Sequence, residues 1–173
     1  TPQRTINDKS YSVDAVEYIS KLADGGMRDA ITLLDKCLAY STELSLENVV
    51  KALGTVDYSI MFQLCDTILS KDSQQLIKII EDIHCQGKDV KQFLRQFTHF
   101  ILDIQKYAIG CSWTYIDIPK LPEYEKWLMK CNDEHFNTLF KLLPVLINLN
   151  SSIKYSSVPK LDIESQLMIF VGV

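Results

Sequence analysis

The sequence has no long hydrophobic run, no paired cysteines and no excess of basic residues. Its uninterrupted apolar runs are only a few residues long, whereas a membrane-spanning helix needs about 20. With no basic-then-apolar leader at the start, we expect a cytoplasmic protein without a membrane partner. Lys and Arg number 18 against 22 Asp and Glu, giving a net charge of −4, which argues against a self-sufficient nucleic-acid-binding module.

Signatures of metal and nucleophile chemistry are also lacking. The cysteines are odd in number, lie far apart and include no CxxC pair, so neither a zinc site nor a disulfide framework is expected; they are Cys37, Cys65, Cys85, Cys111 and Cys131. The three histidines, His84, His99 and His135, have no partner nearby in sequence at metal-ligand spacing. No G-x-x-x-x-G-K-[ST] loop is present, so this chain is not expected to hydrolyse ATP alone.

Helical periodicity is what the sequence does contain. Apolar residues recur every three to four positions, and no long stretch alternates as a half-buried strand does, so we predict an all-α fold. Predicted helices begin near Val13, Met27, Leu46, Tyr58, Ser73, Val90, Glu123, Asp133 and Pro159. We predict a loop over residues 111–122 that is anchored to the core by its aromatic residues, and a domain boundary at Thr55, Val56 and Asp57.

The strongest helical stripe follows Asp89 and carries Phe93, Phe97 and Phe100, which we predict to be core residues. Lys88, Lys91 and Arg95 make a modest basic edge there, interpreted as a solvated face or a subunit contact. Other predicted apolar faces are Met27, Ala30, Ile31, Leu34 and Leu38 in the second helix, and Phe136, Leu139, Phe140, Leu143, Leu146 and Ile147 in the helix after Asp133. Pro144 is expected to bend that later helix.

The segment LADGGMRDAITLLD, residues 22–35, is the most informative motif. Two glycines open a helix whose second residue is Arg28. Free amides at a helix start favour phosphate, and a first-turn arginine adds a charge-assisted donor to the same anion. Gly25 and Gly26 would let a ligand approach without a side-chain clash. The plainer interpretation is an ordinary turn followed by a solvated Arg–Asp pair.

Four motifs together resemble the gamma/tau subunit of the bacterial DNA polymerase III clamp loader. They are GGMRDAITLLDK, LGTVD at 53–57, DVKQFLRQ at 89–96 and KYSSVPKLDIESQL at 154–167, and they occur in that family's order and spacing. The resemblance extends from about Ser12 to the end. It implies a partial AAA+ helical lid over residues 1–56, lacking the lid's first helix, and a collar domain for oligomerisation over residues 57–173.

The resemblance also implies a role for Arg28, as the sensor-2 arginine that reaches the phosphates of ATP on a preceding core domain. Gly25, Gly26 and Met27 would stand beside the nucleotide. ATP and Mg would then belong to the parent protein, with neither expected on this chain alone. The implied partners are other clamp-loader subunits through the collar, and the sliding clamp and primed DNA through the whole assembly.

Two other interpretations stay open. The chain could be a helical adaptor or scaffold with no nucleotide role, in which GGMRD is only a turn. It could instead be the lid of another AAA+ ATPase, such as a Holliday-junction motor, although that predicts a basic winged-helix module after the lid.

Overall fold

The computed structural model describes residues 3–6, 9–54 and 56–172, with side chains from residue 9 onward. These residues form two compact units. Thr1–Val56 and Pro119–Glu125 make the first unit, and Asp57–Ile118 and Lys126–Val173 make the second. The predicted division had placed residues 119–125 in the second domain. Thr55, part of the predicted boundary, lies outside the described residues.

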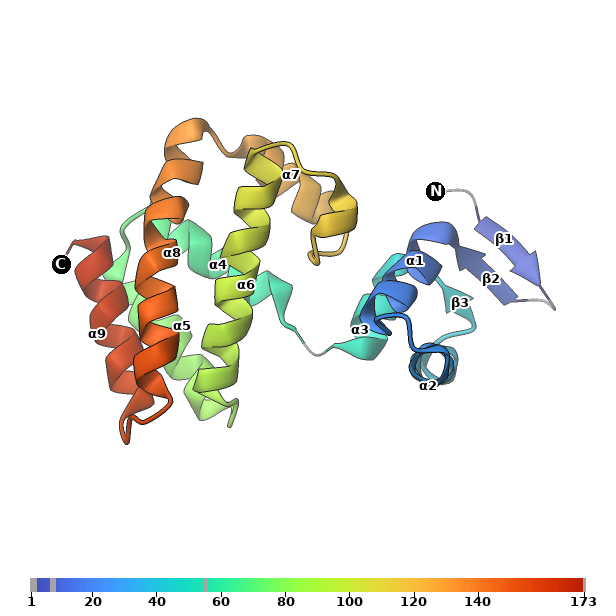
Figure 1. Cartoon of the computed structure of the whole chain (residues 1–173), viewed down its shortest axis with the longest axis horizontal. Coiled ribbons are helices and arrows are strands. Elements are labelled where there is room, and N and C mark those ends of the chain that lie inside the picture. The colour runs from blue at the N-terminus through green and yellow to red at the C-terminus, as the bar shows by residue number, and fades with distance from the viewer. Residues whose placement is uncertain (1–2, 7–8, 55, 173) are drawn as a thin grey trace. The chain divides into compact units, whose positions relative to one another are not determined.

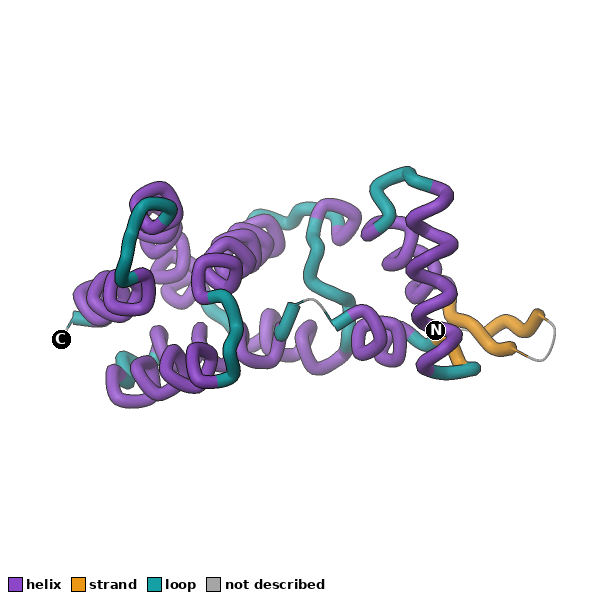
Figure 2. Tube along the Cα trace, turned by 90° about the horizontal axis from the view of Figure 1, so that it is seen from below, coloured by secondary structure: helices purple, strands orange, loops and turns teal. Residues whose placement is uncertain are grey.

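The first unit contains a small sheet beside three helices (Figure 1). Strands β1 (Gln3–Ile6) and β2 (Lys9–Ser12) pair antiparallel, and β3 (Glu43–Leu44) pairs parallel with β2. The helices are α1 (Val13–Leu22), α2 (Met27–Tyr40) and α3 (Leu46–Leu53). This sheet was not predicted, because its strands are too short to show an alternating pattern. Figure 2 shows it as the strand segment of an otherwise helical chain, so the predicted all-α class is confirmed.

The helix starts of the first unit follow their capping residues. Ser12 accepts a hydrogen bond from the Ala15 amide at 3.2 Å, and Ser45 accepts one from the Asn48 amide at 3.2 Å. Each hydroxyl satisfies a backbone donor that has no partner within its helix. These caps explain why α1 and α3 begin where the sequence predicts.

The core of the first unit covers only part of the apolar face predicted for α2. Its fully buried members are Ala15, Ile19, Cys37, Leu44 and Val49, with Leu33, Leu34 and Leu38 packed against them. Met27 and Ile31, predicted to be inward, are instead 75% and 52% exposed. Because α2 has apolar residues on more positions than one face can bury, periodicity alone does not distinguish Leu34 and Leu38, which pack on the core, from the exposed Met27 and Ile31.

The second unit is a helical bundle (Figure 1). It contains α4 (Tyr58–Leu69), α5 (Ser73–Cys85), α6 (Val90–Ala108), the short 3-10 helix η1 (Trp113–Tyr115), α8 (Asp133–Ile153) and α9 (Pro159–Val171), while α7 (Pro122–Lys130) belongs to both units. Asp57, Asp72 and Asp89 cap α4, α5 and α6 through their side chains. Among the described residues, no helix is long and apolar enough to cross a membrane.

The bundle core forms where α6 packs along α8. Phe97 and Phe100 are buried as predicted, and Phe100 meets Phe62 edge-to-face with ring centroids 4.8 Å apart. On α8 the buried face is Leu139, Leu142, Leu146, Leu149 and Ile153. Phe140 and Ile147, which belong to the predicted apolar face, are 59% and 52% exposed, so the core covers only part of that face. Helix α8 continues through Pro144.

The segment after α6 is anchored by aliphatic rather than aromatic residues. Ile116 and Ile118 are 1% exposed, whereas Tyr115 is 68% exposed. Trp113 is partly buried and its indole Nε1 donates to the Ile118 carbonyl at 2.8 Å. The prediction that aromatics anchor this loop therefore holds only for Trp113, because the two isoleucines provide the apolar burial.

Candidate functional site

The turn between α1 and α2 positions the predicted phosphate-binding segment. Asp24 has φ of 47° and Gly25 has φ of 80°, in the left-handed region that favours glycine. A Cβ at Gly26 would lie 2.9 Å from Asp29 Oδ2 and 3.2 Å from the Ala23 carbonyl oxygen. The two glycines therefore permit a tight reversal that delivers the chain into α2 at a defined angle.

The start of α2 presents backbone amides without a side-chain cap. Gly26 is the N-cap residue and makes no side-chain hydrogen bond. Asp29 lies in the first turn, where its negative charge complements the helix dipole. Arg28, which precedes Asp29 in the same turn, is exposed. The positive end of the helix dipole at this position disfavours a cationic side chain. The start of α2 thus combines uncapped backbone amides with the Arg28 guanidinium, whose position is not explained by the electrostatics of the helix.

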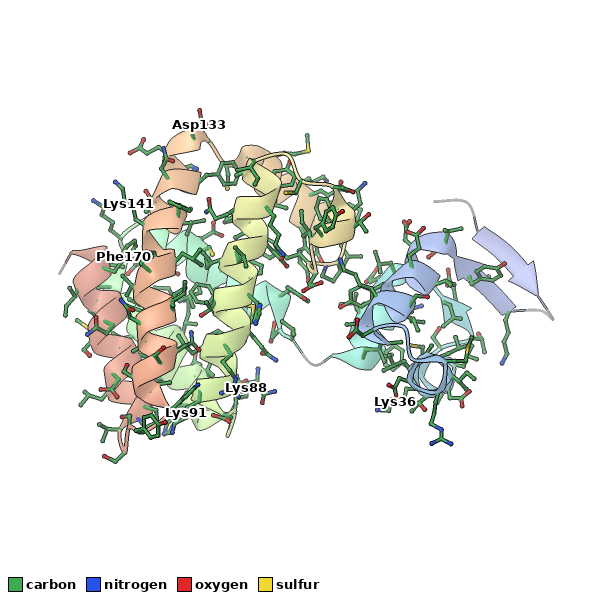
Figure 3. All side chains as sticks on the ribbon, viewed as in Figure 1. Lys36, Lys88, Lys91, Asp133, Lys141 and Phe170 are labelled. Carbon is green, nitrogen blue, oxygen red and sulfur yellow. The ribbon has the colours of Figure 1, made fainter. Side chains whose placement is uncertain are left out.

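The guanidinium of Arg28 makes no ion pair or hydrogen bond within the described residues. Only the Arg28 backbone is engaged locally, since Thr32 Oγ1 donates to its carbonyl oxygen at 2.9 Å. Met27 beside it is also exposed. Lys36, labelled on α2 in Figure 3, is a second exposed cation two turns further along the helix. Arg28 can therefore reach an anion outside its own helix.

The thiols of Cys65 and Cys131 lie in environments that disfavour ionisation. Burial, with a contribution from the Asp66 charge, raises the pKa of Cys131 to about 11, and burial raises the pKa of the Cys65 thiol. Both thiols are protonated at neutral pH and are poor nucleophiles. His135 Nδ1 accepts the Asn132 amide in a capping box at the start of α8. Across the part of the chain described, no group of three or more acidic, Cys or His side chains could hold a metal ion.

One buried acid was missed by the sequence analysis. Asp103 is 4% exposed and lies on the inward face of α6. Its Oδ2 accepts the amide of Asp117 at 2.9 Å and that of Ile118 at 3.3 Å. Desolvation raises the pKa of this carboxyl, and the hydrogen bond from Asp117 acts in the opposite direction. The sequence does show a single acid within an apolar helix stripe. It does not show which groups pair with that acid, because they lie 14 and 15 residues away.

Similarity to known proteins extends over parts of both units. A model of the domain described as "DNA polymerase III subunits gamma and tau domain III" matches residues 44–144. That range covers more than half of the 173 residues. Together with the all-helical fold, this match places the protein in the class of DNA polymerase subunits. The chain belongs to the DNA polymerase III gamma and tau family.

Individual relatives agree with this assignment. The chain is 22% identical over 151 residues to DNA polymerase III subunit tau of Bacillus subtilis, covering 87% of this chain and 27% of the relative. It is 24% identical over 169 residues to DNA polymerase III subunit gamma of Buchnera aphidicola subsp. Acyrthosiphon pisum, covering 96% of this chain and 45% of the relative. This chain therefore spans less than half the length of either relative.

Proposed function

We propose that this chain forms the nucleotide-responsive part of a clamp-loader lid, followed by the collar that assembles the subunits. The parent subunit would bind and hydrolyse ATP with Mg to load a sliding clamp onto primed DNA. The proposal is supported by family membership and by the exposed Arg28 at an uncapped helix start. It assigns residues 1–56 to the lid and residues 57–173 to the collar.

Arg28 is the residue on which nucleotide sensing depends in this proposal. A triphosphate held by a preceding core domain would attract its guanidinium, while the α2 amides add partial positive charge. Gly25, Gly26 and Met27 would lie beside the phosphates without contributing charge. Binding of ATP would draw the lid toward the core and hydrolysis would release it, a hinge movement driven by charge.

Assembly is assigned to the outward face of α9. Leu161 and Ile169 are 59% and 68% exposed, and at 100° per residue they lie within about 80° of each other on that helix. Val158, the N-cap residue of α9, is 50% exposed beside its start. Exposed apolar side chains gathered on one helix face are typical of a protein contact. Other subunits of the same machine would cover this face.

The test of nucleotide sensing uses the intact parent subunit in a reconstituted clamp loader. We expect Arg28→Ala to reduce ATP-dependent clamp loading at least tenfold, since a charge-assisted hydrogen bond contributes about 1.5–3 kcal/mol. Lys36→Ala is the matched control, because it removes another exposed cation from the same helix. Loading that is equal in all three proteins would overturn the role of Arg28.

The test of assembly measures subunit association by light scattering. Leu161→Asp and Ile169→Asp are expected to weaken association while leaving helicity unchanged, because both side chains are exposed. Gln166→Asp, on an exposed position of the same helix, is the control. If subunit association is unchanged in both α9 variants, assembly through this face of α9 is contradicted. That result would leave the Arg28 test unaffected.

A further inference from the structure

A groove between α6 and α8 in the second unit combines cations with a neutral floor. It measures about 330 Å³ and is lined from α6 by Arg95, Thr98 and His99. Its α8 side is lined by Ile147, Asn150 and Ser151, with Lys154 at the helix C-cap. Arg95 and Lys154 supply two positive charges, and no carboxylate is among these lining residues.

The basic end of this groove is reinforced by Lys91. Its Nζ donates to the Lys154 carbonyl oxygen at 3.4 Å, which brings the start of α6 against the end of α8. Figure 3 labels Lys91 and Lys88 in this region of the second unit. In a chain whose net charge is −4, Arg95 and Lys154 make a local positive field in a groove with no lining acid, and Lys91 lies beside them next to Asp89, which caps the start of α6. Such a field attracts carboxylates or phosphates.

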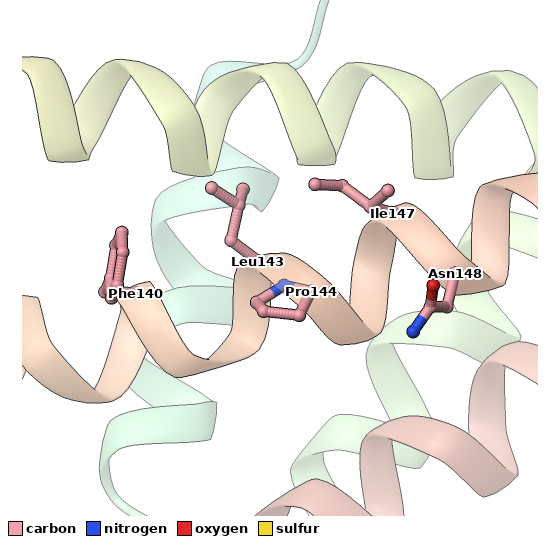
Figure 4. Close-up of a pocket in the computed structure, with 5 residues that line it drawn as sticks. All are labelled: Phe140, Leu143, Pro144, Ile147 and Asn148. Carbon is pink, nitrogen blue, oxygen red and sulfur yellow. The ribbon is translucent and has the colours of Figure 1, made fainter.

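An apolar stripe continues from the groove along α8. Phe140, Leu143, Pro144, Ile147 and Asn148 line a shallow depression on this helix (Figure 4). Ile147 belongs to both the depression and the basic groove. At 100° per residue, Phe140, Ile147, Ser151 and Lys154 fall within about 60° of one another. One face of α8 therefore changes from apolar to basic over about 21 Å, given a rise of 1.5 Å per residue.

The groove floor is polar. Asn150 Nδ2 donates to Thr98 Oγ1 at 2.7 Å and to the Leu146 carbonyl at 2.8 Å. Its Oδ1 is buried, and within the described residues it has no hydrogen-bond partner. If a lining side chain moved aside, a hydrogen-bond donor could enter and pair with this oxygen. The hydrogen bond would offset the desolvation cost of the oxygen, about 1–3 kcal/mol. A peptide N–H is such a donor, and a phosphodiester oxygen is not.

From this arrangement we propose that the α6–α8 face is a docking site for an acidic, apolar peptide segment of another protein. Apolar side chains of the segment pack on Phe140, Leu143 and Ile147, and its carboxylates meet Arg95 and Lys154. A nucleic-acid strand fits less well, since it carries a charge on every nucleotide and would place phosphates against the apolar stripe. This proposal does not depend on Arg28 or on the α9 face.

The test begins with a phage-displayed library of random 16-residue peptides, selected on the whole chain. We expect selected sequences enriched in Asp or Glu and in apolar residues, and a synthetic consensus peptide is then measured by fluorescence anisotropy. Arg95→Glu and Ile147→Asp should each weaken its binding at least tenfold. Both side chains are exposed, so both variants should fold, and thermal melting checks this. Lys78→Glu on α5 removes an exposed cation elsewhere and should change the affinity less than twofold.

Three outcomes would overturn the proposal. The first is a selection that yields no peptide sensitive to Arg95→Glu and Ile147→Asp. The second is binding of a 15-nucleotide oligo(dT) that Arg95→Glu abolishes, because the face would then serve nucleic acid. The third is subunit association lost in Ile147→Asp, because a second copy or another subunit would then cover this face.

Discussion

The Asp103 carboxylate accepts the backbone amide of Asp117 at 2.9 Å, joining α6 to the segment that follows it. Lys106 reinforces this link, since its Nζ lies 3.4 Å from Asp103 Oδ1 and donates to the Tyr115 carbonyl at 2.9 Å. The short segment over residues 113–118 is thus held by side chains of α6 through its backbone groups. Ile116 and Ile118 are buried as a result.

Two substitutions of Asp103 should separate the contribution of its hydrogen bonds to stability from the contribution of its charge. We expect Asp103→Ala to lower the free energy of unfolding by about 2 kcal/mol, because two buried amides lose their acceptor. Asp103→Asn keeps an acceptor oxygen and should cost less than about 1 kcal/mol. Urea denaturation of the three proteins measures both changes. Equal losses for Ala and Asn would contradict the proposed role of the acceptor.

The charge of Asp103 predicts a pH dependence of stability. Burial raises the pKa of Asp103 in the folded protein above the value of 3.8 for an exposed carboxyl, so the folded state binds more protons in the interval between the two values. The Asp103 contribution is therefore fully present below pH 3.8 and lost as pH rises through the folded pKa. Relative to Asp103→Asn, the wild type should gain stability on acidification through this interval. The opposite slope in paired urea titrations would mean that the hydrogen bonds outweigh desolvation.

Gly25 should be sensitive to substitution although no atom outside the adjacent residues lies within 4 Å of its added Cβ. Its φ of 80° strains any L side chain, so we expect Gly25→Ala to destabilise the first unit by about 1 kcal/mol. Thermal unfolding monitored by hydrogen exchange at α1 and α2 would detect the change. Ala30→Gly, at a helical position, is a control for loss of helix propensity alone. A Gly25→Ala protein as stable as the wild type would indicate that the turn adopts another conformation.

Leu146 and Ile147 form a matched pair on α8, because one is fully buried and its neighbour is 52% exposed. Leu146→Ala should cost about 2–5 kcal/mol through lost burial and a cavity. Ile147→Ala should cost less than about 1 kcal/mol, since half of that side chain already faces solvent. Chemical denaturation distinguishes the two. A large loss of stability in Ile147→Ala would contradict the exposure of this side chain.

Much of the helical framework could be predicted because its signals are local. Ser12, Ser45, Asp57, Asp72 and Asp89 each combine a capping side chain with a following apolar pattern, and each caps the helix that follows it. The burial of Phe97 and Phe100 follows from the same periodicity. The all-helical class of the chain was therefore accessible from the sequence.

The errors arise where a helix has apolar residues on two faces. In α2 and α8 the sequence offers more apolar positions than the core of either unit covers, so the predicted apolar faces include Met27, Ile31, Phe140 and Ile147, which are exposed. Which face is buried depends on neighbouring helices distant in sequence. The same limit concealed the partners of Asp103 and the basic groove of Arg95 and Lys154. The role of Arg28 remains a prediction based on resemblance and local electrostatics.

The most direct test of nucleotide sensing is how the intact subunit discriminates ATP from ADP at equilibrium, with and without Arg28. If the guanidinium contacts the terminal phosphate, Arg28→Ala should reduce the ratio of ATP to ADP affinity by about 10- to 150-fold, the equivalent of about 1.5–3 kcal/mol, and leave ADP binding nearly unchanged. An unchanged ratio in the Arg28→Ala subunit, with its fold and assembly intact, would contradict nucleotide sensing by this residue.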